Sequence, residues 1–158
     1  MKKITITITA AIVIILSSFN QTQQPNLKAS IERGQKVYAS TCLACHQADG
    51  DGVPRMNPTL MKTKWVLGDK KALAKIVLNG LAGGEIEIDG DSYHNPMPAQ
   101  ATVLTDLQIA DVLTYVRNSF GNKASLVTPA EVKGARATAK SEVAKPGTAK
   151  PAKKSTKG

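Results

Sequence analysis

Two cysteines and a histidine stand together in the run Cys42-Leu43-Ala44-Cys45-His46, and their types and spacing suit them to chemistry. Two residues separate the thiols, and an imidazole follows the second thiol directly. This is the spacing of covalent haem attachment, in which the thiols add to the two vinyl groups of one macrocycle and the imidazole ligates the iron. The motif therefore predicts one haem c, bound through Cys42 and Cys45, with His46 as an iron ligand.

Three other interpretations of this motif are weaker. A structural zinc site normally takes four Cys or His ligands, but the chain has two cysteines and two histidines in all, and His94 is distant in sequence. A thioredoxin-like dithiol is found in a βαβ context, whereas we expect a helix before this motif and a loop after it. A disulfide between residues three apart would be strained and would close almost no loop.

An iron held by one histidine needs either a second axial ligand, for electron transfer, or an open position for small molecules. Met97 stands between two prolines in Asn95-Pro96-Met97-Pro98. These prolines stiffen the loop, so the thioether could be presented at little ordering cost. His94 precedes the same loop and is the rival ligand. Because methionines more often fill cores, spacing alone leaves Met97, His94 and plain packing open.

Three helices are expected to position these groups in an all-α domain. The first begins at Ser30, as N-cap, and runs to about Thr41, so it ends at the motif. The second follows an N-cap at Asp69 and stops at Gly80, and the last follows an N-cap at Thr105 and ends before Gly121. Residues 29–120, which contain all three helices, form a segment so small that a buried cofactor would complete its core.

Shorter features connect these helices. Residues 47–64 are rich in Gly, Asp and Pro and predict an irregular loop that leaves the motif directly. Alternating residues around an Asp-Gly pair predict a small β-hairpin over residues 85–93. Gly34 lies inside the first predicted helix, where glycine costs about 1 kcal/mol relative to alanine. We therefore expect another element to approach the backbone at Gly34.

The formal net charge of +9 is unevenly distributed. Residues 29–120 carry nine basic and ten acidic side chains, so this segment lacks the basic excess that would indicate nucleic-acid binding. Residues 121–158 carry nine basic and two acidic ones. Residues 123–158 are rich in Lys, Ala and Pro and are expected to be a disordered tail, either simply solvated or attracted to anionic lipid, cell-wall polymer or an acidic partner.

The chain opens with two lysines before an apolar run from Ile4 to Leu16. A bilayer-spanning helix needs about 20 apolar residues, so this shorter run favours a cleaved signal peptide over residues 1–24. We therefore expect export to the periplasm or to the outer face of the cytoplasmic membrane, and a domain over residues 25–122. Haem attachment outside the cytoplasm agrees with this location.

Taken together, the motif and its surroundings resemble a class I c-type cytochrome, most closely the single-haem domains that accompany quinoprotein dehydrogenases and terminal oxidases. The resemblance covers the segment from about Ser30 to Asn122. Its strongest pieces beside the haem motif are Asn57-Pro58-Thr59-Leu60, Val77-Leu78-Asn79-Gly80, Met97-Pro98 and the run from Ile109 to Arg117.

The resemblance implies a role for several residues. Met97 becomes the sixth iron ligand, and the Pro58 carbonyl accepts the His46 Nδ1–H, which would fix the imidazole orientation. The family packs its first and last helices at a glycine and an aromatic pair. Gly34 with Tyr38, against Val112 with Tyr115, match those places. Trp65 or Arg55 could bond a haem propionate, with packing or exposure as the alternatives.

The function expected from this resemblance is one-electron transfer between Fe(III) and Fe(II), without enzyme activity of its own. The partners would be a dehydrogenase, a cytochrome complex or a terminal oxidase. The alternatives are the haem subunit of a periplasmic quinoprotein dehydrogenase, a peroxidase in which Met97 is labile, and a haem gas sensor.

Overall fold

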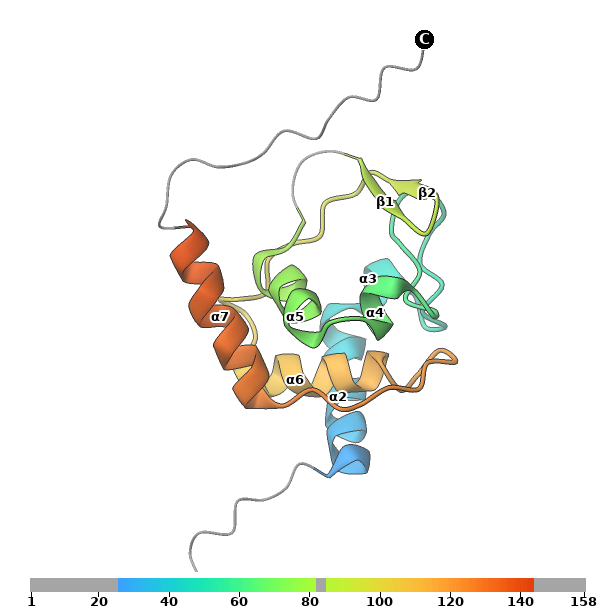
Figure 1. Ribbon diagram of the computed structural model, residues 1–158. Helices are drawn as coiled ribbons and strands as arrows, with labels where there is room; N and C mark the ends of the chain where they lie inside the picture. The colour runs from blue at the N-terminus through green and yellow to red at the C-terminus, as the bar shows by residue number, and fades with distance from the viewer. Residues whose placement is uncertain (1–25, 82–84, 144–158) are drawn as a thin grey trace, which may run out of the picture.

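Helices make up most of the protein, and one small β-hairpin lies at its edge (Figure 1). The computed structural model describes residues 26–81 and 85–143. The helices are α2 (Leu27–Thr41), α3 (Leu43–His46), α4 (Lys64–Leu67), α5 (Lys70–Asn79), α6 (Asp106–Val116) and α7 (Pro129–Val143), and the strands are β1 (Ile86–Ile88) and β2 (Asp91–Tyr93). This arrangement confirms the predicted all-α class with one short hairpin.

Helices α2 and α6 cross at Gly34, as the cost of that glycine predicted. A Cβ at this position would overlap the carbonyl oxygen of Asp111 and the Cβ of Tyr115. Beside the crossing, the rings of Tyr38 and Tyr115 lie 5.3 Å apart, and Phe120 lies 5.3 Å from Tyr38. The missing side chain therefore lets the two backbones meet, and three aromatic rings pack beside this crossing in tilted and edge-to-face arrangements.

The helices begin at the polar N-cap residues that were predicted from the sequence, with one exception. Asp69 caps α5 by accepting from the Ala72 N–H, and Thr105 caps α6 in a capping box with Gln108. The prediction of Ser30 as the first cap is wrong, because the Asn26 side chain accepts from the first turn and α2 begins at Leu27. The buried Ser30 hydroxyl instead donates to Asp111 at 2.6 Å.

The predicted hairpin forms, with Ile86 paired to Tyr93 and Ile88 to Asp91. Its turn residues Asp89 and Gly90 both have positive φ, as a type I′ turn requires. Ile88 and Tyr93 are buried, so one face of the hairpin packs inward.

The prediction of a disordered tail over residues 123–158 is wrong for residues 123–143. Pro129–Val143 form helix α7, which packs against α5 and α6 (Figure 1). The apolar positions Val127, Val132, Ala135 and Ala139 are all buried. Small side chains on one helical face thus bury enough surface to dock the helix, although the segment as a whole is polar. Residues 144–158 and the predicted signal peptide over residues 1–24 lie outside the described residues.

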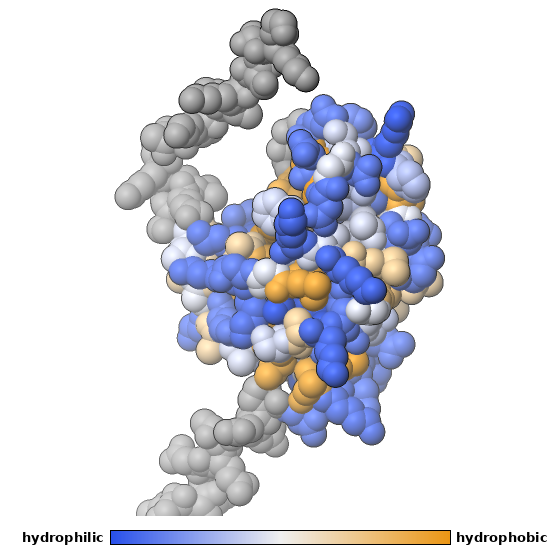
Figure 2. All heavy atoms as spheres, turned by 45° about the vertical axis from the view of Figure 1, so that its right-hand side comes forward, coloured by the Kyte–Doolittle hydropathy of each residue, from blue (hydrophilic) through white to orange (hydrophobic). Residues whose placement is uncertain are grey.

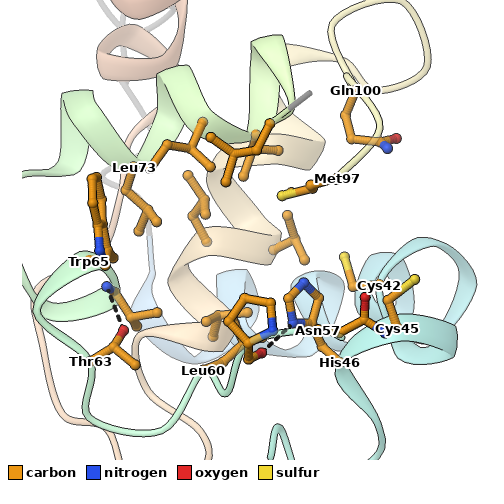
Figure 3. A pocket seen from close by; sticks show the side chains of 18 of the residues that line it. Cys42, Cys45, His46, Asn57, Leu60, Thr63, Trp65, Leu73, Met97 and Gln100 are labelled. Carbon is orange, nitrogen blue, oxygen red and sulfur yellow. Dashed lines mark hydrogen bonds between the residues drawn. The ribbon is translucent and has the colours of Figure 1, made fainter. Parts of the chain in front are cut away.

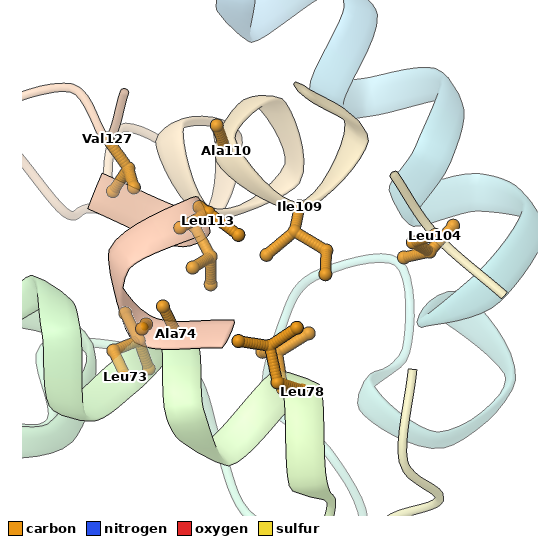
Figure 4. Packing of buried hydrophobic residues seen from close by; sticks show 11 residues of the cluster. Leu73, Ala74, Leu78, Leu104, Ile109, Ala110, Leu113 and Val127 are labelled. Atoms are coloured by element: carbon orange, nitrogen blue, oxygen red, sulfur yellow. The ribbon is translucent and has the colours of Figure 1, made fainter. Parts of the chain in front are cut away.

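The larger hydrophobic cluster lies between α5, α6 and α7 (Figure 4). Its buried members are Leu73, Ala74, Val77, Leu78, Leu104, Ile109, Ala110, Leu113, Val127, Val132 and Ala135. This cluster forms one wall of a cavity and supports the side chains that point into it. Among the described residues, no helix has the length and apolar content needed to cross a bilayer.

Candidate functional site

The haem motif opens onto an apolar cavity of about 210 Å³ in the middle of the protein (Figure 3). Its walls come from the end of α2, from residues 57–66, from α5 and from α6. Cys42, Cys45 and His46 line it, together with Pro58 and Met97. The fold thus brings every residue predicted for the site to one cavity, although they span 56 residues of the chain from Cys42 to Met97.

His46 is held by the loop that follows the motif. Its Nδ1 lies 3.0 Å from the carbonyl oxygen of Pro58, so the hydrogen bond that the resemblance implied is present. With Nδ1 engaged as donor, Nε2 is the nitrogen free to bind a metal. Burial lowers the pKa of the imidazole, and the bond to Pro58 opposes this shift. Burial therefore favours a neutral imidazole at neutral pH, and the bond to Pro58 orients the ring.

The backbone turns sharply directly after His46. Gln47 has a φ of +62°, and its carbonyl oxygen accepts a hydrogen bond of 2.7 Å from the Tyr38 hydroxyl. Burial raises the pKa of Tyr38 well above its ordinary value, so this hydroxyl remains a donor. The aromatic cluster at the α2–α6 crossing therefore also anchors the end of the motif.

The two cysteines are free thiols on one side of the cavity, which excludes a disulfide between them in this structure (Figure 3). Burial, and to a lesser extent the neighbouring Cys45, raise the pKa of Cys42 to about 11. Because the thiolate is the nucleophile, burial lowers the reactivity of Cys42 at neutral pH in the folded chain.

Met97 faces His46 across the cavity, and its sulfur points into the space between them (Figure 3). Two backbone hydrogen bonds tie Met97 to Leu81, at 2.8 and 2.9 Å. Gly80 makes this approach feasible, because its φ is +69° and a Cβ there would overlap the Met97 carbonyl oxygen. The sequence indicated Gly80 only as a helix stop, and its contact with Met97 was not predicted.

The other candidates lie elsewhere. His94 is exposed, donates its backbone N–H to the Arg55 carbonyl, and does not line the cavity. Met56 and Met61, the two methionines nearer to His46 in the sequence, are exposed and outside the lining. Trp65 lines the cavity while remaining 46% exposed, so it stands at the rim, whereas Arg55 is exposed and away from the lining.

These donors fit a covalent haem c, with two sulfurs on one side of an apolar cavity and an imidazole and a thioether facing each other across it. Within residues 26–81 and 85–143, no three His, Cys, Asp or Glu side chains gather into a group that could hold a metal ion. The ligand set of a structural zinc site is thus not assembled in this part of the chain.

Comparisons with known proteins agree with this arrangement. Residues 31–120 match the family model of cytochrome c. The cytochrome c subunit of gluconate 2-dehydrogenase from Pantoea cypripedii is 35% identical over 105 residues, which are 63% of this chain and 23% of that protein. Cytochrome c-552 from Thermus thermophilus is 36% identical over 93 residues, 56% of this chain and 69% of that protein.

A third relative, cytochrome c-555 from Prosthecochloris aestuarii, is 31% identical over 96 residues, which are 58% of this chain and 94% of that protein. The chain therefore spans less than a quarter of the dehydrogenase subunit but most of the two small cytochromes. The motif, the cavity and these matches together show that the chain belongs to the cytochrome c family, whose members carry electrons on a covalently bound haem c.

Proposed function

We propose that this protein is an exported one-electron carrier, in which Cys42 and Cys45 hold the haem and His46 and Met97 ligate its iron. The single observation that supports this proposal best is the placement of His46 and Met97 on facing walls of one apolar cavity. When bound, the haem supplies the Fe(III)/Fe(II) couple, and no acid, base or nucleophile from the chain is required.

The chain's own residues keep this site ready for electron transfer. The Pro58 carbonyl orients the imidazole, and the two backbone hydrogen bonds between Met97 and Leu81 hold the backbone at Met97. Apolar side chains from α5 and α6 line the remaining wall and exclude water. A site held this firmly reorganises little when one electron arrives or leaves, and that is the property an electron carrier needs.

Spectroscopy of protein from a host that attaches haem tests the ligand assignment. A Soret band that acid acetone cannot remove is expected, because thioethers are covalent. The ferric protein should also show the weak far-red band of sulfur-ligated iron. This band should disappear in Met97→Ala and persist in His94→Ala. A natural ferric protein that lacks this band, and whose spectrum changes in His94→Ala but not in Met97→Ala, would assign the sixth position to histidine, which lowers the reduction potential relative to methionine.

Reactivity with small molecules separates a carrier from an enzyme or a sensor. A site with both axial positions filled by the chain should turn over peroxide slowly and bind CO slowly in its ferrous form. Stopped-flow mixing measures both rates. Peroxide turnover comparable to that of isolated peroxidases, or fast CO binding, would replace the carrier assignment with one of those functions.

The partners we propose are redox proteins of the kinds named by the relatives. These include the gluconate dehydrogenase subunit and a cbb3-type cytochrome c oxidase subunit from Azospirillum brasilense, 32% identical over 101 residues. On the face shown in Figure 2, hydrophilic residues predominate and hydrophobic side chains form small groups between them. Such a surface suits the small, transient interfaces of electron-transfer encounters. Co-purification in mild detergent would identify the partner, and a stable stoichiometric dehydrogenase complex would favour the subunit alternative.

Residues 1–24 are the proposed export signal, on the strength of two lysines before a short apolar run. A chain lacking these residues should remain in the cytoplasm without covalent haem, which fractionation and haem staining would reveal. Equal haem content with and without residues 1–24 would contradict export through this segment.

Residues 144–158 carry five lysines and no acidic residue, and we propose that they attract the protein weakly to anionic membrane surfaces. Binding to vesicles of anionic lipid should fall with added salt and disappear in a chain that ends at Val143. Equal binding of the two chains would leave the tail as a solvated extension.

A further inference from the structure

Met97 lies in residues 97–104, called here the methionine segment. Backbone hydrogen bonds join this segment to α5 and to Leu81, which follows α5. Met97 pairs with Leu81, the Gln100 N–H donates to the Val77 carbonyl, and the Ala101 N–H donates to the Leu78 carbonyl. Apart from the Met97 carbonyl, which accepts from the Leu81 N–H, these bonds use N–H groups of the segment. The carbonyl oxygens of Ala101 and Leu104 face the other way, towards α7.

One side chain of α7 binds both of these carbonyls. Arg136 donates from Nη1 to the Ala101 carbonyl, from Nη2 to the Leu104 carbonyl at 3.0 Å, and from Nε to Asp106 Oδ1 at 2.6 Å. Asp106 is the first residue of α6. The planar fork of a guanidinium can make three such bonds at once, whereas a lysine ammonium cannot reproduce that geometry.

The Arg136 side chain is held in position because α7 packs against the hydrophobic core. Val132 and Ala135 lie in the larger core cluster, against which Met97 and Ala101 also pack. The Arg136 side chain is only 20% exposed. Helix α7 therefore holds the guanidinium in a fixed place beside the end of the methionine segment. The nearest carbonyl that it binds, that of Ala101, lies four residues after Met97 in the sequence.

Helix α7 lies wholly beyond residues 31–120, the part that matches the cytochrome c family model. We infer that this extension positions the sixth ligand: Arg136 clamps residues 101–106 and so controls how readily Met97 leaves the iron. Arg136 is a positioning residue, since it contacts the segment and not the haem site. The inference rests on the proposed ligation by Met97.

Displacement of Met97 by an external ligand measures this control. Imidazole binds ferric iron only when the thioether has left, so its apparent affinity reports the population of the opened segment. Arg136→Ala should raise the imidazole association constant about tenfold, and Arg136→Lys, which keeps the charge near Asp106, about threefold. The far-red band of Arg136→Ala should also disappear at a lower alkaline pH than that of the natural chain.

Arg33→Ala is the matched control. Arg33 also bonds an aspartate through Nε at 2.6 Å, but its partner Asp111 lies at the α2–α6 crossing, away from the methionine segment. This variant should bind imidazole within about twofold of the natural chain, even where its unfolding midpoint falls as far as that of Arg136→Ala. Hydrogen exchange should quicken at the Gln100 and Ala101 amides in Arg136→Ala only.

Three results would overturn the role inferred for Arg136. Equal imidazole affinity in the Arg136 and Arg33 variants would overturn the inference, because a merely structural ion pair would then explain both. Should Arg136→Ala fail to fold, Arg136→Lys decides, and an affinity equal to that of the natural chain overturns it. A natural chain without the far-red band would instead refute Met97 ligation itself, and the inference with it.

Discussion

At Gly34 the backbones of α2 and α6 approach closely, and a single added methyl group tests that contact. In Gly34→Ala the new Cβ would overlap the Asp111 carbonyl and the Tyr115 side chain. Both belong to α6, so the helices must separate. We expect a loss of roughly 1–3 kcal/mol in the free energy of unfolding, the usual range for overpacking. Urea denaturation followed at the Soret band measures it.

Gly134 provides the control for this substitution. It lies within α7, it is exposed, and a Cβ there meets nothing within 4 Å. Gly134→Ala should therefore stabilise the protein by about 0.5–1 kcal/mol, because alanine restricts the unfolded chain more than glycine does. Similar effects of the two substitutions would mean that close packing at Gly34 is not the reason for its glycine.

Among the longer helices, α7 is the one that the sequence did not predict. Its buried face is built largely from alanines, which add little hydrophobic signal in a segment rich in lysine and proline. A local signal was nevertheless present. Thr128 precedes Pro129 and is followed three residues later by Glu131, which is the pattern of a capping box with proline in the first turn. In the structure Thr128 and Glu131 form that box.

The N-terminus of α7 should be sensitive to acid. Partial burial raises the pKa of Glu131, but hydrogen bonds from Lys70 and Thr128 outweigh burial and bring the pKa below its ordinary value of 4.5. A carboxylate with a depressed folded-state pKa stabilises the fold fully above the unfolded-state value and loses that effect as pH falls through the folded-state value. The contribution of Glu131 should therefore be present at pH 7 and absent in strong acid.

Glu131→Gln isolates this charge, because glutamine can still complete the capping box. The variant should be less stable than the natural chain at neutral pH, and the difference should shrink as pH falls below 4.5. Denaturant midpoints across the acid range measure it. A difference that stays constant with pH would assign the effect to packing.

Removing α7 should expose the core beneath it. A chain ending at Asn122 loses the buried side chains of Val127, Val132 and Ala135, and we expect roughly 4 kcal/mol less stability from their lost burial. A chain ending at Val143 is the control and should unfold at the same denaturant concentration as the full chain. If the shorter chain were equally stable, α7 would not be part of the cooperative unit.

At the scale of the whole molecule, the cofactor is expected to be part of the core. The cavity separates the α5 wall from the haem motif and Met97, so side chains from α5 and α6 lack partners across it without a bound group. The double variant Cys42→Ala, Cys45→Ala should consequently show reduced helicity by circular dichroism and no sharp unfolding transition. Helicity and cooperativity equal to those of the haem-containing protein would contradict this expectation.

The sequence predicted the parts of this fold that local chemistry dictates, and missed those that depend on distant partners. The caps at Asp69 and Thr105 and the hairpin turn at Asp89 and Gly90 follow from neighbouring residues. Arg136 gave no such signal, because its three partners lie 30 to 35 residues away. A motif and a family resemblance predicted the cavity residues from the sequence. The contacts that hold the Met97 backbone could be identified only from the three-dimensional structure.

The crossing of α2 and α6 also governs the order in which the chain can fold. The Ser30 and Asp111 side chains that meet there are separated by 81 positions, and joining such distant segments carries an entropic cost that grows with the logarithm of the loop length. The haem motif and Met97 both lie inside this long loop. When the haem is attached within this loop, contacts with one rigid group bring the two halves of the loop together. Fewer chain conformations then have to be searched before Ser30 meets Asp111. Haem attachment should therefore speed the formation of the α2–α6 crossing.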